Sequence, residues 1–599
     1  MEPSLVKAKI QGSEKTPYAI LFFMTLLYFT AFTVFSINRH NRFGTSGFDL
    51  GIFDQAIWLL SRGEPAFVTV RGLHIFGDHA SYIHLFTAPL FWLWDDVRAL
   101  LVLQSFAIAS GAVPIYLIAR DRMNSRWSPL VFSAAYLMYP SLQHINLWQY
   151  HPETLGVPFL LWAFYFAAAG RAKPYYLFVA LTLITKEEFA LTVFLLGLFV
   201  AVKYDRRMGA VTSIAAVLWL LTVFKILLPY FNPMGYFRFS QGQVVFGKLG
   251  RTPAEVVANV FLRPKTVFHA LVNSVNATYL FNLLAPVGFL AALSPLTLGV
   301  ASLVLFTNMI SDFIYMHLFN HHYTAIIIPV IFVATVYGVS NLKTRRLRHA
   351  ALALLIGSTI LGNIYLAPFD ASLKNYRHTI RLVKNFGNPN PGYEEAAYQA
   401  ISLIPEDASV SATPFFVPHL THRKIIYEYP NPFEQANWGV ADENPPSKDV
   451  EYLLINMEPL PEEHRQIVRS LLELGLFETV YEKNEILLLK KSFNSSLDEK
   501  YPLVQARLDP LRHDLAVSKK DYTICDDIKS TEIRGNCFRE VAVKTEDYNL
   551  CAVKIKSQQA RDQCYLDIII ATGDLNLCTL RIESDVLKKR CQETLRPAP

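Results

Sequence analysis

Apolar segments recur through the first 366 residues of the chain, with short polar stretches between them. Runs of this kind predict membrane-spanning helices, about eleven of them. They are expected near residues 17–37, 98–119, 127–143, 154–169, 174–185, 189–202, 209–229, 279–293, 297–310, 323–340 and 350–366. From residue 367 onward the apolar runs are shorter, as in a soluble protein. The pattern therefore predicts a polytopic α-helical membrane part, residues 1–366, followed by soluble domains.

The first soluble stretch, residues 367–492, combines short apolar runs with helical patterns. We expect strands near 409–413, 424–429, 451–456 and 485–490, and helices over 392–403 and 462–474. Strands that alternate with helices predict a small α/β domain with a partly parallel sheet. Its role is open between binding an acceptor and covering a cleft. Residues 493–520 are polar and are expected to form a linker.

The last stretch, residues 521–599, holds all six cysteines of the chain in an internal repeat. Each unit is too small to bury a core alone, so we predict three helical hairpins stacked in an array, with Asp residues at the joints as helix caps. The repeat favours one disulfide in each hairpin, with reduced core cysteines as the alternative. The expected pairs are Cys525–Cys537, Cys551–Cys564 and Cys578–Cys591.

Composition and charge support a membrane protein and predict its orientation. Hydrophobic residues make up 52% of the chain, and the mean hydropathy is +0.25. Lys and Arg gather in alternate loops, which the positive-inside rule places in the cytoplasm: Arg120, Arg122, Arg126, Arg171, Lys173, Lys203, Arg206, Arg207, Lys343, Arg345, Arg346 and Arg348. The N-terminus is then cytoplasmic, and an odd number of spans places the soluble domains outside the cell. These loops explain the net charge of +6, which gives no indication of nucleic-acid binding.

The loops on the opposite side are poor in Lys and Arg but rich in acid–base groups. The candidate site residues are Asp49, Asp54, Arg71, Asp78, His79, His151, Glu153, Lys186, Glu187, Glu188, His321 and His322. Asp49, Asp78 and His79 are also candidate ligands of a divalent metal, Mg²⁺ or Mn²⁺, whereas no spacing matches a zinc signature. We interpret the set as one functional face. Polar loops that only anchor the chain at the membrane interface are the alternative.

The turn Thr185-Lys186-Glu187-Glu188 is expected to lie below the membrane surface. The apolar runs on either side of it are shorter than the roughly 20 residues that cross a bilayer. Ionisable groups at such a depth must face a cavity or each other, and they usually mark a functional site. One long helix with a buried Lys–Glu pair is the alternative.

Two other segments on the predicted outer side could border or cover a substrate site. Residues 81–94 are aromatic and too short to span, which predicts a re-entrant or interface-lying helix beside a lateral cleft. Residues 230–277 form a long polar segment that is either a lid over an anionic substrate or a solvated loop.

Five short motifs are specific in combination: Phe-Asp-Leu-Gly-Ile-Phe-Asp-Gln at 48–55, His-Pro-Glu at 151–153, Thr-Lys-Glu-Glu at 185–188, Asn-His-His-Tyr-Thr-Ala at 320–325 and Ile-Pro-Glu-Asp-Ala-Ser-Val at 404–410. Together they resemble a prokaryotic multi-pass membrane family catalogued as domain of unknown function 2079. The resemblance covers residues 20–490. That family is similar in layout to the type-C (GT-C) glycosyltransferases, which take a sugar from a polyprenyl-phosphate carrier.

The resemblance implies an inverting transfer of a hexose or pentose from a polyprenyl-phosphate carrier to a glycan, lipid or protein acceptor on the outer face. In such enzymes an acidic residue of the first outer loop serves as general base or metal ligand. Asp49 matches that position best and Asp54 is the second choice. On a regular helix the two are about 140° apart, so they cannot both aim at one atom. Glu153 and Glu187 are further catalytic candidates. Lys186, with Arg71 or a histidine, would neutralise the leaving phosphate.

The chain has no glycine-rich nucleotide-binding motif, as expected for an enzyme with a lipid-linked donor. The alternative function is a transporter or flippase for a lipid-linked or anionic solute. Such a protein would be expected to show paired half-repeats and ionisable groups near the membrane midplane. The sequence shows no clear repeat in the membrane part, which favours the transferase.

Overall fold

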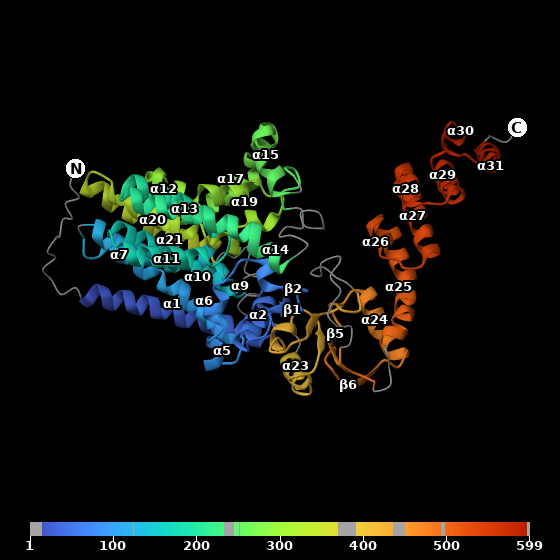
Figure 1. Ribbon diagram of the computed structural model, residues 1–599, viewed down its shortest axis with the longest axis horizontal. Helices are drawn as coiled ribbons and strands as arrows, with labels where there is room; N and C mark the ends of the chain where they lie inside the picture. The colour runs from blue at the N-terminus through green and yellow to red at the C-terminus, as the bar shows by residue number, and fades with distance from the viewer. Residues whose placement is uncertain are drawn as a thin grey trace. The chain divides into compact units, whose positions relative to one another are not determined.

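The computed structural model describes residues 15–123, 125–232, 245–250, 252–368, 391–434, 450–492 and 497–595. Contacts divide the chain into two compact units. The first comprises residues 1–429 and 435–446 and holds the apolar helices (Figure 1). The second comprises residues 430–434 and 447–599.

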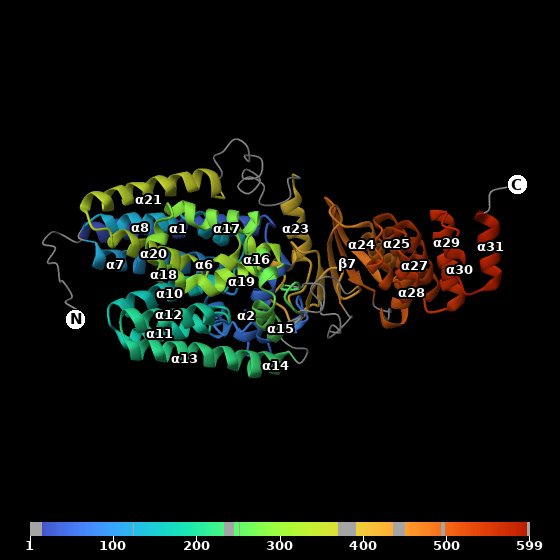
Figure 2. The ribbon, with the colours of Figure 1, turned by 90° about the horizontal axis from the view of Figure 1, so that it is seen from above.

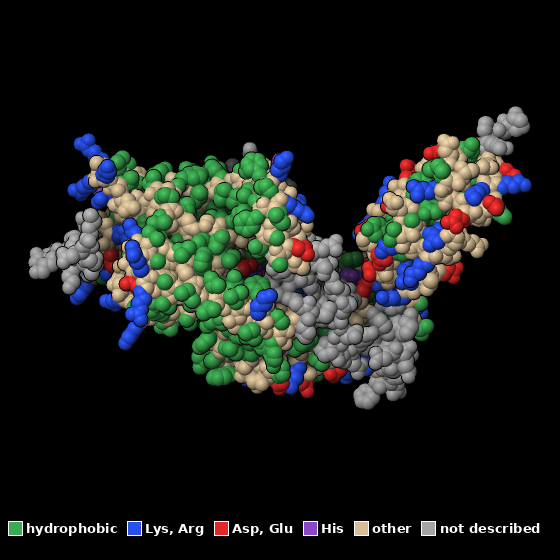
Figure 3. Space-filling model, turned by 45° about the horizontal axis from the view of Figure 1, so that its top comes forward, with side chains coloured by type: hydrophobic (Ala, Val, Ile, Leu, Met, Phe, Trp, Pro, Cys, Tyr) green, Lys and Arg blue, Asp and Glu red, His purple; other side chains and the backbone are tan. Residues whose placement is uncertain are grey.

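The apolar helices of the first unit run along a common direction and share one hydrophobic core (Figures 1 and 2). They are α1 (Lys15–Asn41), α6 (Arg98–Ser110), α7 (Ala112–Arg122), α8 (Ser128–Leu137), α9 (Pro140–Trp148), α10 (Glu153–Ala168), α11 (Ala172–Leu183), α12 (Phe189–Lys203), α13 (Arg206–Thr222), α17 (Ser274–Leu284), α18 (Pro295–Leu298), α19 (Ser302–Ile310), α20 (Ile328–Ser340) and α21 (Arg345–Leu366). On the face drawn in Figure 3, hydrophobic side chains cover much of this unit. The surface is therefore suited to contact with lipid.

Four helices among the described residues are long and apolar enough to cross a membrane: Lys15–Asn41, Arg98–Arg122, Arg206–Phe231 and Arg345–Leu366. Six shorter apolar helices have 10–17 residues. Several expected spans are interrupted. The span near 127–143 divides into α8 and α9 because Pro140 begins a new helix. The span near 279–293 is broken at Pro286 and at Gly288, which has φ +59°. The span near 297–310 corresponds to one shorter apolar helix, Pro295–Ile310. The number of spans stays a prediction.

The predicted break at Lys186 is confirmed, because α11 ends at Leu183 and α12 begins at Phe189. The alternative of one continuous helix is wrong. Helix α13 follows α12 in the chain, and the backbones of the two helices are in close contact. A Cβ atom at Gly209 would overlap the backbone nitrogen of Ala201. Small residues that allow such a close approach are typical of helices packed in a membrane.

The connections between the apolar helices of the first unit are partly helical. They contain α2 (Ile52–Ser61), α3 (Ile75–Asp78), α4 (His84–Thr87), α5 (Leu90–Leu93), α14 (Leu228–Phe231), α15 (Pro253–Leu262) and α16 (Pro264–Leu271), with a small hairpin of β1 (Phe67–Val68) and β2 (Leu73–His74). The expected interface-lying segment forms α4 and α5, which leave Phe86, Trp92 and Leu93 exposed. The predicted lid or loop near 230–277 contains α15 and α16, and its residues 233–244 and 251 lie outside the described residues.

The last described segment of the first unit, residues 391–429, contains α23 (Tyr393–Ser402), β3 (Val410–Ala412) and β4 (Ile426–Glu428). The two strands pair in parallel, with Val410 opposite Ile426. All three elements were expected. Arg42 pairs with Glu394, and the Tyr398 hydroxyl donates to the carbonyl of Asn41. This segment therefore packs against the end of α1.

The second unit begins with strands β5 (Tyr452–Asn456), β6 (Phe477–Lys483) and β7 (Ile486–Lys491) and helix α24 (Glu462–Glu473). Strand β7 pairs antiparallel with both β5 and β6. The sequence predicted these elements except β6. That strand has mostly exposed side chains and therefore no continuous apolar run.

The cysteine repeats form stacked helical hairpins with the three predicted disulfides. Their helices are α26 (Thr523–Asp526), α27 (Thr531–Thr545), α28 (Tyr548–Lys554), α29 (Gln558–Thr572), α30 (Leu577–Arg581) and α31 (Asp585–Leu595). The segment expected as a linker forms α25 (Leu497–Lys519), while residues 493–496 lie outside the described residues. Ala516 of α25 belongs to the same core as the cysteines. Asp509 accepts hydrogen bonds from the backbone of Lys529 and Ser530, so α25 also caps the array.

Candidate active site

Asp49 lies in a strained turn between α1 and α2. Residues Gly47–Gly51 form this turn, and Asp49 adopts φ +69° and ψ −84° inside it. Residues other than glycine seldom adopt such angles, which cost about 1–3 kcal/mol and cluster at functional sites. The segment is therefore not regular helix, and the expected separation of Asp49 and Asp54 along one helix does not apply.

His151 faces Asp49 from the loop between α9 and α10. Its Nε2 atom lies 3.3 Å from Oδ2 of Asp49, and its Nδ1 atom lies 3.1 Å from the carbonyl oxygen of Gln149. Burial alone would raise the pKa of the Asp49 carboxyl, but His151 and His322 outweigh burial and hold that pKa below its usual value. Burial alone would lower the pKa of His151, yet Asp49 holds it above its usual value. The two side chains therefore form an ion pair.

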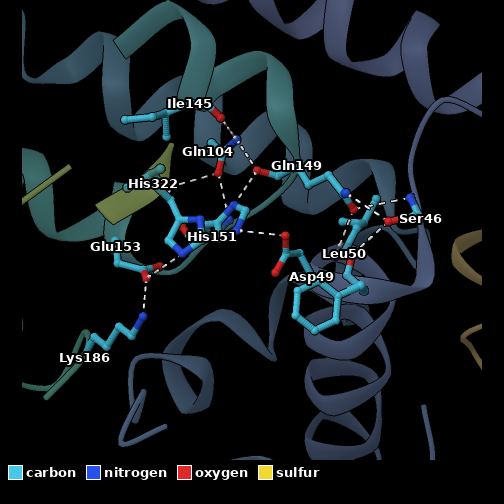
Figure 4. A network of polar contacts seen from close by, with 12 residues as sticks. Ser46, Asp49, Leu50, Gln104, Ile145, Gln149, His151, Glu153, Lys186 and His322 are labelled. Atoms are coloured by element: carbon cyan, nitrogen blue, oxygen red, sulfur yellow. Dashed lines mark hydrogen bonds and ion pairs between the residues drawn. The ribbon is translucent and has the colours of Figure 1, made fainter. Parts of the chain in front are cut away.

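Three more residues complete this cluster, which Figure 4 shows from close by. The His322 ring stacks on the His151 ring at 4.0 Å, and its Nε2 atom lies 3.9 Å from Oε1 of Glu153. The Lys186 ammonium group lies 2.5 Å from the same Glu153 oxygen. Oε2 of Glu153 and Nδ1 of His322 are buried and have no hydrogen-bond partner among the described residues. Two buried polar atoms of this kind favour a polar ligand.

A second group of predicted residues meets the Lys186 turn through Glu187. Nδ1 of His79 lies 2.9 Å from Oε1 of Glu187, and the backbone nitrogen of Ala80 donates to Oε2 of Glu187. Arg71 forms a two-pronged pair with Asp78 at 3.2 and 3.3 Å. The Lys186-Glu187 turn thus links both groups. The side chains of Arg71 and His79 are 22% and 30% exposed, so both can meet a ligand.

The remaining predicted residues are Asp54, His321 and Glu188. Asp54 is fully buried on α2, where Thr421 donates a hydrogen bond to it and His422 lies beside it. His321 contacts the side chain of Asn320 and the ring of Trp148. Burial raises the pKa of Glu188, and Lys186 offsets this effect only in part.

The sequence argument missed Gln104, Gln149, Thr421 and His422. Gln149 immediately precedes Tyr-His-Pro-Glu, and its closeness to that motif is the only signal that would have indicated it. Nothing local in the sequence relates Thr421 or His422 to Asp54.

The three candidate metal ligands do not come together among the described residues. Among the described residues, no group of three or more His, Cys, Asp or Glu side chains is arranged to hold one. Asp49 faces His151, Asp78 faces Arg71 and His79 faces Glu187, so these three candidate ligands do not form such a group.

Known proteins resemble this chain in structure and in sequence. Two solved structures of ArnT from Cupriavidus metallidurans are similar at 13% sequence identity. One is the apo state, with a TM-score of 0.47 over 80% of this chain and 98% of that one. The other is bound to undecaprenyl phosphate, with a TM-score of 0.46 over 78% and 98% of the two chains. No curated protein matches the sequence. The family described as "Predicted membrane protein (DUF2079)" matches residues 39–488. The chain therefore belongs to this family of membrane proteins.

Proposed function

We propose that the protein is a membrane glycosyltransferase that moves a sugar from a polyprenyl-phosphate carrier to an acceptor hydroxyl on the outer face of the membrane. The observation that supports this most is the Asp49–His151 pair. It places an ionised carboxylate on a strained turn, beside a buried cluster with unsatisfied polar atoms.

The reaction needs one base and one leaving group. Asp49 accepts the proton of the acceptor hydroxyl while that oxygen attacks the anomeric carbon. The bond from that carbon to the phosphate oxygen breaks, and polyprenyl phosphate leaves with the electron pair. General base catalysis of this kind contributes about 10²–10⁴-fold to the rate.

The cations of the cluster suit the leaving phosphate. The Lys186 ammonium group has three N–H donors, and Glu153 accepts from one of them. Arg71 and His79 are partly exposed, and His79 pairs with Glu187 of the same turn. We assign the phosphate to Arg71 and His79, because their side chains are partly exposed while that of Lys186 is buried against Glu153. The unsatisfied oxygen of Glu153 then suits a hydroxyl of the sugar or acceptor.

A lipid-linked substrate fits the position of the cluster. Glu153 begins α10, the Lys186 turn precedes α12, and His322 precedes α20, all of which are apolar helices. The reactive groups thus lie at the ends of apolar helices, where the head of a lipid meets water while its tail stays among hydrocarbon.

The direct test is transfer by the purified protein in lipid nanodiscs. Synthetic polyprenyl-phosphate sugars are the donors, lipid, glycan and protein fractions are the acceptors, and released polyprenyl phosphate is measured. Asp49→Asn should lower the rate about 10²–10⁴-fold, and Glu187→Gln tests the second carboxylate. Asp312→Asn is the matched control, since Asp312 pairs with Lys248 outside the cluster. An unchanged rate in Asp49→Asn contradicts the assignment. In vesicles, donor that crosses the bilayer without transfer supports a flippase instead.

A further inference from the structure

Gln149 joins the turn that carries Asp49 to the loop that carries His151. We infer that Gln149 is a positioning residue, which holds the side chains of Asp49 and His151 in the relative orientation that the reaction needs. The inference rests on the proposed function, because it concerns how the same carboxylate is held.

The side chain of Gln149 bridges the two ends of the strained turn (Figure 4). Its Oε1 atom accepts from the backbone nitrogen of Ser46 at 3.3 Å and from that of Leu50 at 3.1 Å. Its Nε2 atom donates to the hydroxyl of Ser46 at 3.1 Å. Asp49 lies between the two anchored residues. Strained backbone persists only where its surroundings hold it, and Gln149 supplies three of the bonds that do so.

The backbone of Gln149 orients the partner of Asp49. Its carbonyl oxygen accepts from Nδ1 of His151, which leaves Nε2 of that ring directed at Asp49. Gln104 fixes the same stretch, because its Nε2 donates to the Gln149 carbonyl at 2.9 Å and its Oε1 accepts from the backbone nitrogen of His151 at 2.9 Å. Gln149 therefore positions both Asp49 and His151.

The chemistry of the contacts requires a carboxamide. An acceptor must serve two N–H groups while a donor meets the Ser46 hydroxyl, and a glutamine side chain supplies both. Methionine has a similar length and supplies neither. Gln149 is only 5% exposed, so its removal leaves the amide groups of Ser46 and Leu50 without the acceptor they had.

The test compares Gln149→Met with Gln143→Met. Gln143 is a buried glutamine on α9 that bonds Asn363, outside the cluster, and is the matched control. In Gln149→Met we expect kcat to fall by about 10²-fold, the effect of a small misplacement of a reacting group, while the donor KM stays within about threefold. In the double variant with Asp49→Asn the losses should not add, since both act through one carboxylate.

A second measurement does not depend on activity. Hydrogen–deuterium exchange of peptides over residues 44–53 should be about five- to tenfold faster in Gln149→Met than in wild type or Gln143→Met, because two amides lose their acceptor. Additive losses, or unchanged exchange and unchanged kcat, would overturn the inference. If the wild type shows no transfer, the proposed function fails, and exchange alone then decides whether Gln149 holds the turn.

Discussion

Oδ2 of Asp54 lies 3.3 Å from Nε2 of His422, although 368 residues separate the two in the chain. Nδ1 of His422 lies 2.9 Å from Oδ1 of Asp95, so the imidazole is held between two carboxylates. The backbone nitrogen of Gly47 also donates to the carbonyl of Pro414. The segment of residues 391–429, which follows the last apolar helix, thus packs against the Asp49 turn and α2. We interpret Asp54 as the residue that holds this segment in place. Asp49 is the carboxylate that we propose as the general base.

Replacement of Asp54 is expected to lower the stability of the folded protein, and not only its transfer rate. Asp54→Ala removes the acceptor of the Thr421 hydroxyl and the buried partner of His422, which should cost about 1–3 kcal/mol. Thermal unfolding of the purified protein measures the effect. Asp95→Ala is the comparison, because Asp95 is 45% exposed and its loss should matter less. Equal melting temperatures for wild type and Asp54→Ala would contradict the docking role.

The docked segment should also respond to pH. Burial lowers the pKa of His422, but Asp54 and Asp95, with Asp96 nearby, outweigh it and hold that pKa above its usual value. A raised folded pKa gives stability that is fully present below the unfolded value, about 6.5, and that is lost as pH rises through the folded value. The melting temperature should therefore fall on the alkaline side, and His422→Gln should flatten that fall. His74→Gln is the comparison and should not, because burial lowers the pKa of His74 and a lowered histidine pKa affects stability on the acid side.

Loss of His151 should shift the acid limb of the pH–rate profile. His151→Gln removes the charge that holds the pKa of Asp49 down and leaves burial, which raises it. The limb of kcat/KM on which Asp49 becomes protonated should move to higher pH by about 1–3 units. His317→Gln is the control, since His317 bonds Asn276 and the Ser311 carbonyl. A profile unchanged by His151→Gln would show that the pair does not control the base.

The Lys186–Glu153 pair offers a double-mutant cycle. The side chains are 4% and 2% exposed, so removal of one partner leaves a buried charge. Lys186→Met is expected to cost about 3–5 kcal/mol, and addition of Glu153→Gln should recover part of that loss. Thermal unfolding in one detergent measures both variants. Additive destabilisation in the double variant would argue against a coupled pair.

The disulfides should stabilise the helical array. Cys551 and Cys564 close a loop with a sequence separation of 13, which is worth about 3 kcal/mol in the chain-entropy model. Replacement of both by serine should speed proteolysis of the second unit and leave the melting of the first unit unchanged. All six cysteines are paired, so alkylation of the denatured, non-reduced wild type should modify none. Any alkylated cysteine would contradict the pairing.

The sequence predicted features that depend on local patterns. The helix break at Lys186, the parallel strands β3 and β4 and the cysteine pairs all follow from the order of nearby residues. The sequence also brought His151 and Glu153 into the set of candidates, because both stand in one short motif.

The contacts that define the cluster are long-range, and the sequence could not predict them. Nothing near Asp54 points to His422, and nothing near Ser46 points to Gln149. The geometry of Asp49 was also hidden, since the Asp49–Asp54 spacing argument assumed regular helix where the chain makes a strained turn. Proline and glycine positions inside long apolar runs ended helices that hydropathy alone treats as continuous.

The strained backbone at Asp49 implies a trade-off between the stability of the fold and the proposed activity. A glycine at this position would adopt φ +69° without steric cost, so Asp49→Gly should relax the turn while removing the proposed base. Stabilising changes at reactive positions often reduce function. A selection for thermostable variants of this protein would therefore favour Asp49→Gly, which should be more stable but should lack the proposed activity.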